Sequence, residues 1–101
     1  MNTANLQLEG LLVAMAQLTR QIAEAGVLPR ESIRHALDAA ETAILADEQR
    51  RAQLSDSQIE AMLFPVRYLA TALSPASAGR GFSDTAADIG RAKAAGADRT
   101  A

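Results

Sequence analysis

The chain contains a single histidine, His35, and the residues around it have the types needed for proton or metal chemistry. Glu31, His35 and Asp38 are spaced so that a helix places them along one ridge. An imidazole between carboxylates is able to shuttle a proton or to bind a metal ion. This ridge points away from the apolar positions Ile33 and Leu37, and an exposed ridge forms neither a water-excluding pocket nor a supporting shell. We therefore interpret it as solvated surface.

The sequence offers no other starting point for catalysis. It has no cysteine, which excludes disulfides, thiolate metal ligands and a cysteine nucleophile. It has no G-x-S-x-G or H-E-x-x-H motif, and the G-R-G at residues 79–81 is too short to form a phosphate-binding loop. We predict no catalytic residue, no metal site and no cofactor, and hence a protein that is not an enzyme.

Charge and hydropathy limit the classes of partner. The 101 residues carry a formal net charge of -2, which gives no general attraction to nucleic acid or to an anionic membrane surface. The apolar run of residues 10–18 is too short to span a membrane, and no Lys or Arg precedes it as in a signal peptide. We expect neither nucleic acid nor membrane as a partner, and we expect a cytoplasmic location.

The elements that must position any site are helices. The stretch 6–25 is strongly apolar, with large or small apolar residues at alternating intervals of three and four: Leu8, Leu11, Met15, Leu18, Ile22 and Ala25. This is the spacing of a coiled-coil seam, and it predicts a helix over about 5–25, capped by Thr3 or Asn5, whose seam is buried. We expect the rest of the chain to pack on it. Gly26 and Pro29 predict a short link that folds the next helix back as an antiparallel hairpin.

The same spacing recurs twice. A second helix is predicted over about 29–53, with the seam Ile33, Leu37, Ala40 and Ile44, and a third over about 56–73, with the seam Ile59, Met62, Val66, Leu69 and Leu73. Ser55 and Gln58 match a capping box at the start of the third helix. Three segments with one spacing predict an all-α fold, a three-helix up-down-up bundle over residues 1–73.

Two features complicate this bundle. Pro65 predicts a kink or break in the third helix. The bend either lets the helix wrap its neighbours or turns Phe64 toward a binding partner.

Residues 74–101 are mostly small and polar, with Phe82 and Ile89 as the only large apolar side chains. They predict a flexible, mostly disordered C-terminal tail with a possible short helix over about 84–93.

Two apolar strips lie outside the predicted seams, and they are the best candidates for a functional surface. One is on the first helix and the other, with two aromatic rings and an arginine, is on the third; together they comprise Leu12, Val13, Ala16, Phe64, Arg67 and Tyr68. Aromatic residues and arginine are typical anchors of protein interfaces. Either the three helices bury both strips within one chain, or the strips bind another chain.

We predict the second outcome: a non-enzymatic helical protein-protein interaction module that self-associates, as a homodimer, or binds an unidentified protein partner. The alternative is a small-ligand-binding or regulatory helical domain. Its apolar pocket would lie between helices near Met15, Met62 and Pro65, where soft side chains adapt to a ligand.

Overall fold

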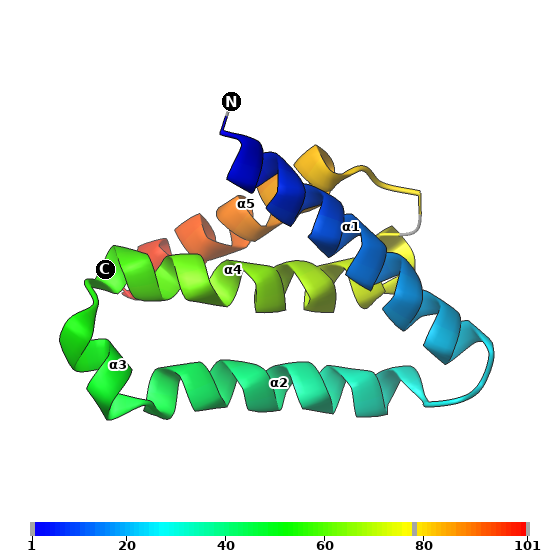
Figure 1. Ribbon diagram of the computed structural model, residues 1–101, viewed down its shortest axis with the longest axis horizontal. Helices are drawn as coiled ribbons and strands as arrows, with labels where there is room; N and C mark the ends of the chain where they lie inside the picture. Colours follow the sequence, from blue (N-terminus) through cyan, green and yellow to red (C-terminus); the bar gives the residue numbers. More distant parts are fainter. Residues whose placement is uncertain (1, 78, 101) are drawn as a thin grey trace.

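The computed structural model describes the backbone of residues 2–77 and 79–100, with side chains described up to residue 92. Within these residues the chain is helical and contains no strand, as Figure 1 shows. The elements are α1 (Thr3–Glu24), α2 (Arg30–Ala46), α3 (Glu48–Gln53), α4 (Asp56–Leu73), the 3-10 helix η1 (Pro75–Ser77) and α5 (Phe82–Thr100). The all-α prediction is confirmed.

Helix α4, not α1, is the element on which the others pack. It contacts α2 most extensively and also contacts α1 and α5, whereas α1 and α2 barely touch. In Figure 1, α2 and α4 run alongside each other in opposite directions, and α1 crosses the molecule obliquely. The expectation that the chain packs on the first helix is therefore wrong.

The reason lies in the distribution of buried residues around α4. Ile59 and Leu63 are buried on one side of this helix, and Tyr68 and Ala72 are buried on the opposite side. A helix that buries two opposite faces needs neighbours on both. The structure supplies α2 on one side and α1 with α5 on the other.

The seams predicted for the second and third helices are confirmed in part, since the buried residues Leu63, Tyr68 and Ala72 of α4 lie outside them. Ile33 of α2 is buried, and Ile59 and Leu73 of α4 are buried, while the remaining seam residues are half-buried: Leu37, Ala40, Ile44, Met62, Val66 and Leu69. These two helices form the antiparallel pair that their short apolar repeats favour. The antiparallel link predicted between the first two helices is present, but the two helices diverge from it instead of packing along their lengths.

Several helix ends match their local signals. Gly26 has φ of +74°, the amide of Val27 donates to the carbonyl of Ile22 at 3.1 Å, and the amide of Gly26 donates to the carbonyl of Ala23 at 3.1 Å. These two bonds make the Schellman motif that ends α1. At the other end, Asn2 caps α1, so the predicted caps Thr3 and Asn5 are wrong and lie inside the helix.

The predicted second helix is divided at Asp47. This residue has an extended backbone, and its carboxylate accepts a hydrogen bond from the amide of Arg50 at 3.0 Å. An aspartate in this position competes with the continuing helix by capping a new one. The single helix expected over 29–53 is therefore α2 followed by α3.

Helix α4 begins at the predicted capping box and passes through the proline. The amide of Gln58 donates to the Ser55 hydroxyl at 3.2 Å, and the amide of Ser55 donates to Oε1 of Gln58 at 2.9 Å. The helix then runs without a break through Pro65 to Leu73. Packing against α1, α2 and α5 outweighs the one hydrogen bond that proline removes.

Part of the predicted tail is an ordered element of the fold. Phe82 and Ile89 of α5 pack on a cluster formed by α1 and α4, and the short helix predicted over 84–93 lies within α5. Disorder is thus not found for residues 82–92. The predicted flexibility of residues 78 and 101 lies outside the described residues, and the division into a domain of residues 1–73 and a tail stays a prediction.

Candidate interaction surface

The face of α1 predicted to be buried is exposed along its length. We call it the α1 strip: Leu8, Leu11, Met15, Leu18 and Ile22, with exposed fractions between 36% and 59%. The prediction that this seam is buried is wrong. The buried residues of α1 are Leu12, with 3% exposed, and Ala16, with 4% exposed. Helix α1 therefore rests on a neighbouring sector of its wide apolar surface and leaves the seam uncovered.

Aromatic packing explains which sector is used. Leu12 and Ala16 form a buried cluster with Tyr68 and Ala72 of α4. The Tyr68 ring lies 5.1 Å from that of Phe82 and 6.3 Å from that of Phe64, measured between centroids, within the range of favourable aromatic pairs. The small side chains at positions 16 and 72 allow α1 and α4 to approach each other closely beside this aromatic group.

The structure divides the six residues of the predicted interface. Leu12, Ala16 and Tyr68 lie in the core of a single chain, Phe64 and Arg67 are half-buried, and Val13 is exposed. They do not form one accessible surface. Whether any of them contacts a partner stays a prediction.

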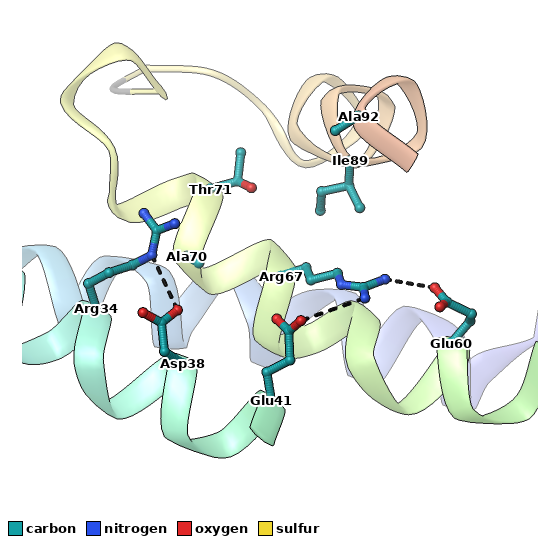
Figure 2. A pocket seen from close by; sticks show the side chains of 9 residues that line it. All are labelled: Arg34, Asp38, Glu41, Glu60, Arg67, Ala70, Thr71, Ile89 and Ala92. Carbon is teal, nitrogen blue, oxygen red and sulfur yellow. Dashed lines mark hydrogen bonds and ion pairs between the residues drawn. The ribbon is translucent and has the colours of Figure 1, made fainter. Parts of the chain in front are cut away.

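Arg67 is engaged within the chain. Its guanidinium lies 2.7 Å from a carboxylate oxygen of Glu60 on α4 and 3.8 Å from one of Glu41 on α2. Figure 2 shows the side chain of Arg67 between these two carboxylates. All three side chains are about one third exposed, so these ion pairs contribute modestly to stability while they link α2 to α4.

Two arginines fix the end of α4 and orient α1. The guanidinium of Arg20 donates to the carbonyl of Ala72 at 2.9 Å and to that of Ser77 at 3.2 Å, and Arg30 donates to the carbonyl of Leu73 at 2.7 Å. The bonds to Ala72 and Leu73 satisfy carbonyls that the C-terminus of α4 leaves without partners. No spacing rule connects residues so distant in sequence, so these contacts could not be predicted.

The Arg20 contact also determines which way the strip faces. Residues two apart in a helix point in nearly opposite directions, so Arg20 lies opposite Leu18 and Ile22 on α1. Because Arg20 is held against the end of α4, Leu18 and Ile22 are turned away from α4.

A polar groove of about 420 Å³ lies between α2, α4 and α5. Figure 2 shows its charged side chains: Arg34, Asp38, Glu41, Glu60 and Arg67. The two arginines pair with the carboxylates, including Arg34 with Asp38 at 3.6 Å. Among the side chains that the structure describes, no three carboxylate or imidazole groups are placed to hold a metal ion.

An apolar groove of about 480 Å³ lies between α1, α4 and α5, with Leu8, Phe64 and Ile89 among its walls. A second hollow of about 260 Å³ is also lined by Leu8, together with Leu6 and Phe82. Neither is lined by Met15, Met62 or Pro65, around which the ligand pocket was predicted. The ligand-binding alternative stays a prediction.

The histidine ridge lies in solvent. His35 Nε2 is 3.9 Å from a carboxylate oxygen of Glu31, and both side chains are largely exposed. Asp38 pairs with Arg34 and not with His35. The three residues are not gathered around any common point where a substrate or ion would be held.

Comparison with known proteins adds no relationship. The chain matches no protein-family model, no curated protein and no solved structure. No helix in the described part of the chain is long and apolar enough to cross a membrane.

Proposed function

We propose that this chain is a non-enzymatic interaction module that forms a homodimer by pairing the α1 strips of two copies. The observation that supports this proposal is the exposure of five large apolar side chains at coiled-coil spacing on one helix. Monomeric proteins rarely expose contiguous apolar surface of this kind. With 22 residues, α1 is about 33 Å long, enough for three heptads.

The spacing favours a helix as the partner, and a second copy supplies one that matches. Knobs-into-holes packing needs apolar residues at intervals of three and four on both helices. The strip carries no charged residue, and the positions along its solvent-facing edge are Gln7, Ala14 and Gln21. Two copies that each carry a net charge of -2 therefore meet no like charges along this surface.

A lipid surface fits the strip less well. Helices that lie on membranes place Lys and Arg on their polar face. The polar face of α1 carries Gln17 and the carboxylates Glu9 and Glu24, and its one arginine, Arg20, is engaged with α4. The α1 strip, an apolar surface with no cationic side chains along its edge, is therefore more typical of a contact with protein.

Sedimentation equilibrium tests the proposal. We expect the unmodified chain to form dimers as its concentration rises, and the double variant Leu11→Glu, Leu18→Glu to remain monomeric with unchanged helical circular dichroism. Both leucines are more than half exposed, so charged replacements are compatible with the folded monomer.

Leu45→Glu is the matched control. Leu45 is an exposed leucine with 40% exposed area, but it lies on α2, outside the strip. This variant should dimerise like the unmodified chain. A chain that stays monomeric at all concentrations, or a double variant that still dimerises, contradicts the proposal.

A further inference from the structure

The two ends of the α1 strip differ in shape. At its end, the link between α1 and α2 presents two large apolar side chains to solvent, Val27 with 71% and Leu28 with 46% exposed. At its start, Leu8 lines the two hollows of about 480 Å³ and 260 Å³. Figure 1 shows the link and the start of α1 at opposite ends of the helix. One end of the strip is therefore followed by exposed apolar side chains, which we call the protruding end, and the other end borders hollows.

From this difference we infer that the two copies pair with their α1 helices antiparallel, so that Val27 and Leu28 of each copy fill the hollows beside Leu8 of the other. This inference rests on the proposed dimer and specifies its geometry. A parallel pair places protruding ends together and hollow ends together, which leaves both hollows open. The antiparallel pair covers both, one at each end of the interface.

The sizes of the seam residues agree with this orientation. In an antiparallel pair the two types of seam position meet each other, which places Met15 opposite Leu18, Leu11 opposite Ile22 and Leu8 opposite Ala25 of the second copy. The smallest seam residue, Ala25, therefore lies opposite the large side chain of Leu8, which fills the space that alanine leaves. A parallel pair sets Ala25 against Ala25 and leaves a gap.

The dipoles of the two α1 helices also favour the antiparallel pair. The positive end of each α1 lies beside the negative end of the other when the helices are antiparallel. The strip itself carries no charges that would oppose this alignment.

Cysteine cross-linking tests the orientation, because the chain has no cysteine of its own. We would prepare Leu11→Cys and Ile22→Cys, label one with ¹⁵N, and oxidise each alone and as a mixture. The antiparallel pair predicts a disulfide between the two different variants and none within either variant alone, which mass spectrometry distinguishes. Gln17→Cys, on the opposite face of α1, is the control and should form no disulfide.

The outcomes separate the orientation from the dimer itself. Disulfides within each variant alone indicate a parallel pair and overturn the inference while the dimer stands. No disulfide in any sample, although sedimentation shows dimers, places the interface elsewhere and also overturns it. Monomers by sedimentation contradict the proposed function as well.

The protruding end has its own test in the full chain. Val27→Ser with Leu28→Ser removes the side chains that fill the hollows without touching the strip. We expect the dissociation constant of the dimer to rise by about tenfold or more. An unchanged constant would show that these residues lie outside the interface and would overturn this part of the inference.

Discussion

At the scale of single residues, two leucines on one helix distinguish the core face of α1 from its exposed face. Leu12 is 3% exposed and Leu18 is 59% exposed, so the same substitution acts on opposite environments. We expect Leu12→Ala to lower the free energy of unfolding by about 2 to 5 kcal/mol, because it leaves a cavity beside Tyr68. Leu18→Ala should change it by less than about 0.5 kcal/mol.

Urea unfolding followed by circular dichroism, at concentrations where the chain is monomeric, measures both changes. The seam spacing alone assigns Leu18 to the core, so the two interpretations predict opposite orders. If Leu18→Ala lowered the free energy of unfolding more than Leu12→Ala, the predicted seam would be the buried face of α1.

Arg20 offers a second comparison at this scale. Its charged hydrogen bonds reach the carbonyls of Ala72 and Ser77, whereas Arg34 pairs with Asp38 in solvent. We expect Arg20→Gln to cost about 1 to 2 kcal/mol of stability, since it removes a charged hydrogen bond to the carbonyl of Ala72 at the end of α4 and another to that of Ser77. Arg34→Gln should cost less than about 0.5 kcal/mol.

The same urea titration measures these variants. Equal losses would mean that the contact of Arg20 with α4 contributes no more than an exposed ion pair. A change in helix content for Arg20→Gln, with stability unchanged, would also contradict the assigned role.

At the scale of elements, the ends of α1 and α4 depend on local chemistry. Gly26 has φ of +74°, where a side chain is strained, whereas Gly10 lies inside α1 with open space around it. We expect Gly26→Ala to destabilise the chain by about 1 kcal/mol and Gly10→Ala to stabilise it by about 0.5 to 1 kcal/mol. The midpoint temperature of thermal unfolding should therefore fall for Gly26→Ala and rise for Gly10→Ala. Shifts of the same sign in both variants would contradict these assignments.

The sequence could predict these ends because each depends on residues close together in the chain. The capping box of Ser55 and Gln58 and the Schellman motif at Gly26 join residues at most five positions apart. The division at Asp47 is equally local, but an aspartate within an otherwise helical stretch is ambiguous, since it is common both on helix surfaces and at caps.

The orientation of α1 could not be predicted in this way. Apolar residues cover more than one face of this helix, so its sequence allows either the strip or Leu12 with Ala16 to face the core. The choice depends on Tyr68, Ala72 and the contacts of Arg20, which are far away in sequence. The sequence therefore identified α1 as a helix with more apolar surface than one neighbour covers, but it assigned the wrong sector of that surface to the core. The predicted interface itself stays a prediction.

At the scale of the whole molecule, α5 packs on the other helices of the fold. Phe82 and Ile89 pack on the cluster of α1 and α4. Two large apolar residues are too few to predict a buried helix from periodicity. We expect a chain ending at residue 81 to be less stable than the full chain by at least about 2 kcal/mol, because it uncovers Phe64 and Tyr68. It should also bind a hydrophobic fluorophore more strongly.

Phe82→Ala in the full chain is the companion variant, and we expect it to lose an intermediate amount of stability. A shortened chain as stable as the full chain would instead support a self-sufficient domain over residues 1–73. Urea unfolding of the three proteins decides between these outcomes.

The order of the helices along the chain has a consequence for biosynthesis. Helix α1 leaves the ribosome well before α4, and the residues that cover Leu12 and Ala16 follow only with α4. At roughly 5 to 20 residues per second, α1 waits for seconds with both its core face and its strip uncovered. For the dimer proposed above, we expect nascent α1 helices on neighbouring ribosomes of one messenger to meet during this interval, so that both copies come from the same messenger.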